Sequence, residues 1–115
     1  MIRLKSLLSE AVTINGVKLA PKNSKYGGPI VATFNGAEYT YRVTVDTFLY
    51  KGKVGVVAIW ESPKKPGTYW LKDNMNKIFE LEDTNLYDIT RQVRQKSDKI
   101  TVSVTGADIT LTKIA

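Results

Sequence analysis

The chain has 115 residues, 43% of them apolar, which is enough for one domain with a modest core and too few for two. It contains no cysteine and no histidine, which excludes disulfides, thiol or imidazole catalysis and the usual zinc, haem and iron–sulfur sites. Seventeen Lys and Arg residues against eleven Asp and Glu give a net charge of +6, which favours nucleic acid or another acidic partner.

An enzyme is difficult to build from the remaining residue types. Acid–base work would fall to carboxylates, Lys or Tyr, and the carboxylates show no spacing typical of a catalytic pair. Residues 80–83, Glu-Leu-Glu-Asp, could hold a divalent ion, although an exposed acidic strand end is the commoner structure. No stretch approaches the roughly twenty apolar residues of a membrane span. We therefore expect a non-enzymatic protein with no cofactor, no metal and no membrane partner.

The first predicted element is a short amphipathic helix over residues 2–11. Leu4, Leu7, Leu8 and Ala11 recur at helical spacing, with polar residues between them. The run is too short and too interrupted by charge for a secretory signal. The helix is expected to cap one end of the fold.

Residues 12–45 contain two Asn-Gly turns. Around Asn15-Gly16 we expect a small turn, followed by a polar loop to residue 28. Residues 30–45 form the clearest hairpin of the chain, because apolar and polar residues alternate on both sides of Asn35-Gly36, a pair that favours the turn matching strand twist.

Three further strands are predicted before residue 82. The apolar run 54–60 is typical of a central strand, and the chain must turn in the segment 61–67, which contains two prolines. Residues 69–71 and 77–81 flank a polar loop as the next two strands. Trp60, Tyr69 and Trp70 could stack nucleic-acid bases on a strand surface, but buried core aromatics are the favoured interpretation.

Residues 84–99 are more ambiguous. Leu86, Ile89 and Val93 suggest a helical turn or two with Thr84 as the cap, while a strand stays an alternative. A basic cluster follows. Its members are Arg91, Arg94, Lys96 and Lys99, and a solvated face is the favoured interpretation, with salt-dependent phosphate binding if the cluster repeats around a ring. The chain finishes in a hairpin over residues 100–114.

The strongest functional signal comes from residues 72–79 and 102–111. The first segment has Asp73, then Met75-Asn76, then the apolar pair Ile78-Phe79. The second has apolar Val104, then Thr105-Gly106, then the alternating apolar Ile109 and Leu111. In this order the two segments resemble the two signature motifs of the Sm and Sm-like proteins, small bent β-barrels that assemble into rings and bind single-stranded RNA. The first spacer is one residue short, and Thr105 stands where the family usually has Arg.

The resemblance implies a fold and a set of contacts. The implied fold is mainly β: a single domain over residues 1–115, with an α-helix at 1–11 and a strongly bent antiparallel β-barrel with an additional hairpin at 12–115. The implied function is a non-enzymatic homo-oligomeric ring that binds single-stranded RNA through pore-facing loops. Asn74 and Asn76 would offer polar contacts beside Lys72, and Gly106 a close backbone approach. Thr105 lacks the flat cationic surface that would stack a base.

Two alternatives remain at this point. The hairpin at 30–45 also resembles the opening hairpin of an Sm barrel, but the later register explains both loops and lets the barrel finish at the C terminus. Separately, residues 8–11, Leu-Ser-Glu-Ala, resemble the site cut by prohead maturation proteases of tailed phages. That resemblance implies a virion or head-packaged structural protein, associated with a capsid and found in the virion or in the cytoplasm of an infected bacterial host.

Overall fold

A computed structural model describes residues 11–22, 28–47, 55–73, 75 and 77–115. These residues contain nine strands and one helix. The strands are β1 Val12–Ile14, β2 Val17–Pro21, β3 Ile30–Phe34, β4 Ala37–Asp46, β5 Val56–Glu61, β6 Thr68–Asp73, β7 Ile78–Glu82, β8 Lys99–Val104 and β9 Ala107–Lys113, and the helix is α2, Asp83–Arg94. The helix predicted over residues 1–11 lies outside the described residues, except for Ala11, which directly precedes β1.

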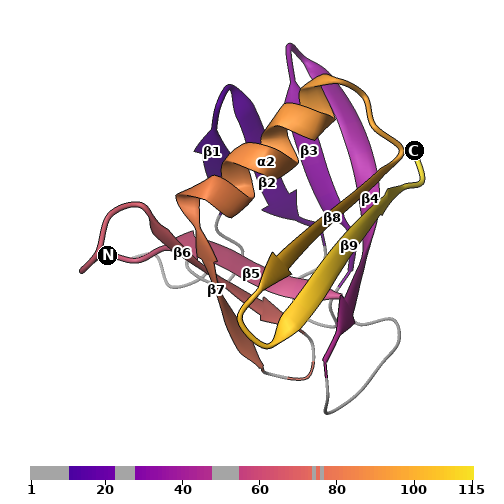
Figure 1. The fold of residues 1–115 in the computed structure, drawn as a ribbon. Helices are drawn as coiled ribbons and strands as arrows, with labels where there is room; N and C mark the ends of the chain where they lie inside the picture. Colours follow the sequence, from indigo (N-terminus) through magenta and orange to yellow (C-terminus); the bar gives the residue numbers. More distant parts are fainter. Residues whose placement is uncertain (1–10, 23–27, 48–54, 74, 76) are drawn as a thin grey trace.

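The strands form two antiparallel sheets. Six strands pair in the order β1-β2-β3-β4-β9-β8, and three pair in the order β5-β6-β7. The larger sheet curls into a half-barrel around α2, and the smaller sheet lies below it in Figure 1. The predicted mainly β, strongly bent antiparallel architecture is confirmed, as are the strands expected at 54–60, 69–71, 77–81 and 100–114.

Both Asn-Gly turns connect hairpins. The hairpin predicted around Asn35-Gly36 is confirmed, with φ of 54° and 80° at the two turn residues. Asn15-Gly16 adopts almost the same geometry, 55° and 79°, and joins β1 to β2. The small turn predicted here is present, and most of the predicted loop that follows lies outside the described residues. The turn joins two strands, and β2 also pairs with β3, a partner that no local pattern reveals.

Strand β4 connects the two halves of the larger sheet. Its first half pairs with β3 and its second half with β9, and Tyr41 lies opposite both Ile30 and Lys113. Tyr41, Val43 and Val45 alternate toward the interior and are fully or almost fully buried. The Tyr41 hydroxyl donates a hydrogen bond to the Ser97 carbonyl, 3.1 Å away, which ties β4 to the chain leaving α2.

Helix α2 is longer than predicted and begins at a different residue. The N-cap is Glu82, not Thr84, and the side chain of Asn85 accepts a hydrogen bond from the Glu82 amide at 2.9 Å. This is the reciprocal contact of a capping box. The helix then continues for 12 residues, so the strand alternative was wrong.

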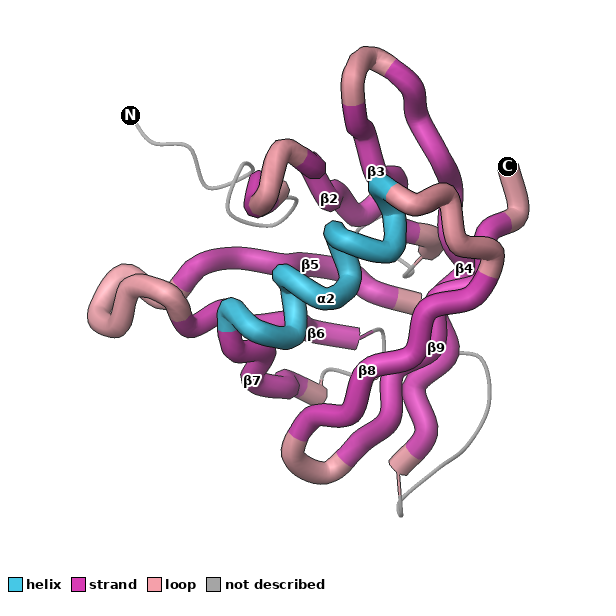
Figure 2. Tube along the Cα trace, turned by 45° about the horizontal axis from the view of Figure 1, so that its top comes forward, coloured by secondary structure: helices cyan, strands magenta, loops and turns pink. Residues whose placement is uncertain are grey.

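The apolar side of α2 closes the interior of the curled sheet. Leu86, Ile89 and Val93 are at most 4% exposed. Thr90, also buried, donates its hydroxyl to the backbone carbonyls of Leu86 and Tyr87, which satisfies its polar atom inside the core. Figure 2 shows the helix lying across the open side of the sheet, with β8 on one side and β1, β2 and β3 on the other.

Replacing Tyr41 tests the link between β4 and the end of α2. Burial, followed by the charge of Asp98 and the proximity of Tyr39, raises the pKa of Tyr41 above its ordinary value of 10.0. Folding therefore favours the neutral phenol. Its contribution to the free energy of unfolding is fully present below the pKa of Tyr41 in the unfolded chain and is lost as pH rises through the higher pKa of the folded protein. We expect Tyr41→Phe to lose about 1 kcal/mol of unfolding free energy at pH 7.

Above pH 10, the variant should lose less further stability than the wild-type protein. Some alkaline loss should remain, because burial also raises the pKa of Tyr69. Urea unfolding at pH 7 and pH 10.5 measures both effects, with Tyr87→Phe, on an exposed side chain, as the control. An identical pH dependence in Tyr41→Phe and wild-type protein would contradict the assignment.

Candidate nucleic-acid interface

The turn between β6 and β7 is shaped by Asp73. This side chain is completely buried, and its Oδ1 accepts hydrogen bonds from the backbone amides of Met75 and Lys77, each 2.9 Å away. An aspartate that binds the amide two residues ahead forms an Asx-turn. Asp73 therefore has a structural role in the first predicted motif. Asn74 and Asn76 lie outside the described residues, so their contacts with RNA stay a prediction.

The outward face of the smaller sheet carries two cross-strand rows. Cα partners place Trp60, Trp70 and Glu80 in one row and Ala58, Lys72 and Ile78 in the next. Residues of the opposite parity, Ile59, Leu71 and Phe79, are buried in the core. We call the outward group Trp60, Trp70, Lys72, Ile78 and Glu80 the tryptophan face.

The two tryptophans differ from the sequence prediction. Tyr69 is buried at 9% exposure, as expected for a core aromatic. Trp60 and Trp70 are only half-buried and do not belong to the buried core cluster. The signal that could have shown this is strand parity, because Trp70 shares the face of Lys72 two residues later, and a lysine rarely points into a core.

The turn between β8 and β9 presents Thr105 and Gly106 to solvent. Gly106 has φ of +89°, a conformation in which other residues are strained, while a side chain added there would meet no atom within 4 Å. The glycine is therefore required by backbone geometry, and the space around it is open. Below the turn, the Ser103 hydroxyl donates to Asp108 Oδ1 at 2.8 Å across the hairpin.

A polar cleft of about 340 Å³ connects this turn to the smaller sheet. It is lined by Glu80 and Glu82 of β7, Thr84 and Asn85 of α2, and Ser103, Val104 and Thr105 at the end of β8. The side chain of Asn85 donates to the Ser103 carbonyl at 3.3 Å, which holds the beginning of α2 against β8. Glu80 belongs both to this cleft and to the tryptophan face. Glu80 therefore links the face that carries Lys72 to the cleft that Thr105 lines.

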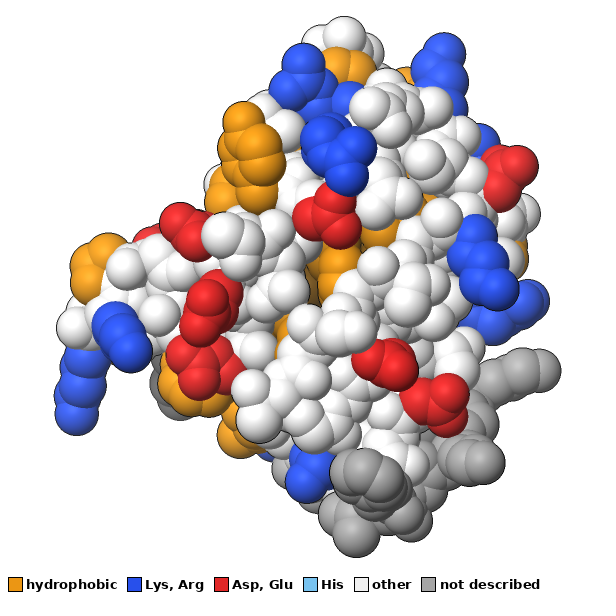
Figure 3. Space-filling model, viewed as in Figure 1, with side chains coloured by type: hydrophobic (Ala, Val, Ile, Leu, Met, Phe, Trp, Pro, Cys, Tyr) orange, Lys and Arg blue, Asp and Glu red, His pale blue; other side chains and the backbone are white. Residues whose placement is uncertain are grey.

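Acidic and basic side chains are unevenly distributed over the molecule. In Figure 3, Asp and Glu side chains lie mainly across the middle of the visible face, while Lys and Arg lie around its periphery, at the top, the right, the left and the bottom. The cleft beside Thr105 is acidic, with Glu80 and Glu82 in its wall. The predicted basic cluster begins in the last turn of α2 and continues to the start of β8, and all four of its members are exposed. Phosphate binding is therefore not favoured at the Thr105 turn itself.

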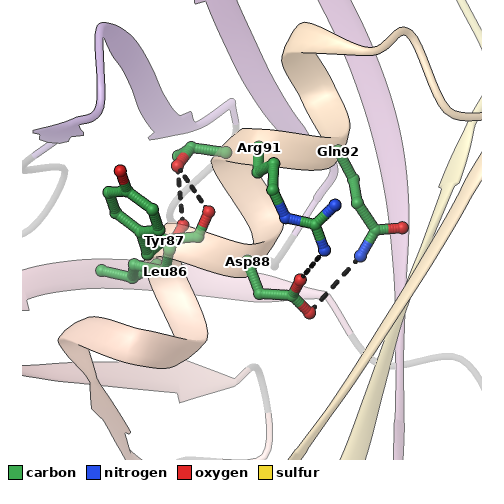
Figure 4. Close-up of polar contacts among 6 residues, drawn as sticks. Leu86, Tyr87, Asp88, Arg91 and Gln92 are labelled. Carbon is green, nitrogen blue, oxygen red and sulfur yellow. Dashed lines mark hydrogen bonds and ion pairs between the residues drawn. The ribbon is translucent and has the colours of Figure 1, made fainter.

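Two members of the basic cluster hold the helix in place. Arg91 forms an ion pair with Asp88 one turn earlier, and Asp88 also accepts from Gln92 at 3.4 Å (Figure 4). Arg94 donates to Asn15 Oδ1 at 2.9 Å and lies 5.5 Å from the centre of the Phe34 ring. Arg91 thus forms a contact within α2, and Arg94 connects the end of α2 to the turns at the top of the larger sheet.

The described residues contain no group of three or more Asp and Glu side chains placed to hold a metal ion. This includes residues 80–83, which the sequence offered as a site for a divalent ion. Leu81 is buried between the two glutamates, and Asp83 is the first residue of the helix. No helix in the described part of the chain is both long and apolar enough to cross a membrane.

No protein-family model, curated protein or solved structure matches the chain. The Sm-like resemblance therefore stays a prediction that rests on the residues themselves.

Substitution of Asp73 tests the origin of the β6–β7 turn. Asp73→Ala removes the acceptor of two backbone amides, and we expect a loss of about 2 kcal/mol in the free energy of unfolding. Asp73→Asn keeps a carbonyl oxygen of the same size and should lose less than half as much. Urea denaturation measures both, with Asp46→Ala on an exposed position of β4 as the control. Equal losses for the Ala and Asn variants would show that charge, and not the Asx-turn, stabilises this site.

Proposed function

We propose that this protein is a non-enzymatic, Sm-like ring protein that binds single-stranded RNA, or another single-stranded nucleic acid, with the ends of β6, β7 and β8. The observation that carries the proposal is the surface shared by the two motif segments. Lys72 lies on the tryptophan face next to the turn held by Asp73, and Thr105 lines the cleft that begins at Glu80 of the same face. Asn74, Asn76 and Gly106 complete the proposed contact set.

Two cations for the phosphate backbone are available, one on the tryptophan face and one at the β6–β7 turn. Lys72 is half-buried on the tryptophan face of β6. Lys77 closes the turn opposite Asp73 and lies toward the other side of the sheet, with its Nζ 5.7 Å from the centre of the Phe79 ring. Their stems pack on the protein while their charged ends reach solvent, as is usual for lysine. Single strands bound in this way depend on salt, because each neutralised phosphate releases counterions.

The proposal of a ring depends on the edge strands of the larger sheet. Among the described strands, β1 and β8 are the outer members of the six-stranded order. The amide of Lys113 donates to the carbonyl of Asp98 at 2.8 Å, which makes these two residues a hydrogen-bonded pair. In an antiparallel ladder such pairs alternate with non-hydrogen-bonded ones, so the N–H and C=O groups of Thr101, three residues later, point away from β9. An edge of this kind offers hydrogen bonds to a strand of another subunit.

Charge reversal at the two lysines tests the binding surface. Fluorescence anisotropy of labelled 15-nucleotide oligo-A and oligo-U should show binding that weakens steeply between low and high salt. We expect Lys72→Glu and Lys77→Glu each to weaken binding and to reduce the slope of log K against log salt by about 0.7, the value for one phosphate contact on a single strand.

Lys18→Glu is the matched control, since Lys18 is an exposed lysine on β2 of the other sheet and its replacement changes net charge equally. Equal losses of affinity in all three variants would show that the effect comes from net charge and not from this surface. An absence of oligonucleotide binding at low salt would contradict the proposal.

The ring makes a separate prediction. Light scattering after size exclusion should give the mass of an oligomer, a whole multiple of the 12.8 kDa chain mass greater than one. Thr101→Pro, which removes an edge N–H, should lower this mass, whereas Thr101→Ala keeps the N–H and should leave it unchanged. Circular dichroism confirms that both variants keep the fold. A wild-type protein that is monomeric at every concentration tested would contradict the ring. It would leave the prediction of oligonucleotide binding unaffected.

The alternative of a phage virion or head-packaged protein rests on residues 8–11. Residues 8–10 lie outside the described residues, and no feature of the described fold favours this role over nucleic-acid binding. It stays a prediction from the sequence.

A further inference from the structure

We infer that the Trp60–Trp70 pair is a stacking platform for nucleic-acid bases and that Glu80 beside it accepts hydrogen bonds from base amino groups. This inference rests on the proposed function and names the part of the surface that reads the bases. It assigns to two tryptophans on β5 and β6 the stacking that Thr105 cannot provide.

The geometry of the pair suits stacking. Trp60 and Trp70 are direct cross-strand partners in the register of β5 and β6, so their side chains leave the same face of the sheet from Cα atoms about 5 Å apart. Neighbouring strands hold both backbones in place. A rigid strand surface therefore presents two adjacent indole rings, the arrangement used by proteins that bind single strands through aromatic stacking.

Two exposed apolar side chains lie between the pair and the β6–β7 turn. Ile78 on the same face is 51% exposed, and Met75 in the adjoining turn is 60% exposed. These are two of the four large apolar side chains in the described residues that are classed as exposed. An apolar strip thus runs from the tryptophans to the β6–β7 turn, where the flat faces of unpaired bases would lose water on binding.

Charge on the face favours a nucleic acid over a purely apolar partner. Lys72 lies diagonally from Trp60 and in the row next to Trp70. A base lying on the indoles would place its phosphate toward Lys72, while the acidic cleft beyond Glu80 repels phosphate. The bound strand is therefore oriented, with its backbone on the lysine side and its bases on the tryptophan side.

Glu80 adds a base preference. It is the direct cross-strand neighbour of Trp70 and is half-buried, so its carboxylate lies at the edge of a base stacked there. A carboxylate accepts hydrogen bonds from exocyclic amino groups, as in its pairing with the cytosine N4 amino group. Adenine and cytosine carry such a group and uracil does not. We expect oligo-A and oligo-C to bind more tightly than oligo-U, and Glu80→Gln, whose amide also donates, to reduce this difference.

Tryptophan fluorescence tests the platform directly, because Trp60 and Trp70 are the only tryptophans in the chain. Titration of the 115-residue chain with unlabelled oligo-A should quench its emission in parallel with binding measured by anisotropy. Trp60→Leu and Trp70→Leu keep an apolar side chain without an aromatic face, and each should weaken binding about tenfold, the effect of one stacked base. Tyr87→Leu, at an exposed aromatic of α2, is the control and should bind like wild type.

The outcomes separate this inference from the function on which it rests. Oligonucleotide binding with unquenched emission, and with Leu variants that bind like wild type, would overturn the platform while leaving the proposed function intact. An absence of all binding would overturn both. Leu variants that lower the mass of an oligomer but bind oligo-A normally would show that the face is a subunit contact, which also overturns the platform. Circular dichroism and Trp60→Phe, which keeps an aromatic face, distinguish lost stacking from lost folding.

Discussion

The fold depends on the burial of one side of α2 in an open, curled sheet. The larger sheet buries an apolar face on its concave side, yet in the order of described strands its edges β1 and β8 pair with nothing across the gap. Leu86, Ile89 and Val93 fill that gap from the helix. Burying a side chain of this kind contributes about 1.5 to 3 kcal/mol relative to leaving it in water, so three of them outweigh any single polar contact in the structure.

The two ends of the helix are attached to opposite edges of the sheet. At the beginning of α2, Asn85 binds the Ser103 carbonyl of β8, and at the end, Arg94 binds Asn15 in the β1–β2 turn. The helix therefore fixes how far the sheet can open. Because α2 begins directly after β7, the same attachment brings β7 and the end of β8 together and creates the polar cleft between them. The candidate interface is a consequence of how the core is closed.

The sequence predicts local structure here more reliably than orientation. Asn35-Gly36 could be recognised because the turn chemistry and the flanking alternation lie within a few residues of one another. The cap of α2 was missed because Glu82 is a less usual N-cap than Thr84, and the contact that decides it comes from Asn85. The role of Asp73 depends on its burial, which a polar residue type does not suggest.

The tryptophans show a different limit. Composition and general burial tendencies favour a core position for aromatic residues, and Tyr69 follows that rule. Within β6 the parity shared with Lys72 is the one local sign that Trp70 faces outward. The row that Trp70 forms with Trp60 and Glu80 depends on pairing across turns of different length, which the sequence does not reveal. Resemblance to family motifs did not help, since Trp60 and Trp70 lie outside both motif segments.

Net charge is a poor guide to where this protein would hold a nucleic acid. The excess of six positive charges belongs to the whole chain, but the exposed basic cluster lies at the end of α2 and the start of β8, whereas the Thr105 turn follows the end of β8. Arg91 and Arg94 already have partners in the fold, so part of that cluster serves the helix. On the tryptophan face, Lys72 and Glu80 lie on neighbouring strands in adjacent rows. Such a surface attracts a polyanion only weakly from a distance. At contact it selects the orientation of the strand, because the lysine row binds phosphates and the adjacent tryptophan and glutamate row binds bases. Specific recognition there depends on stacking and on the base edge, with the lysines only placing the backbone.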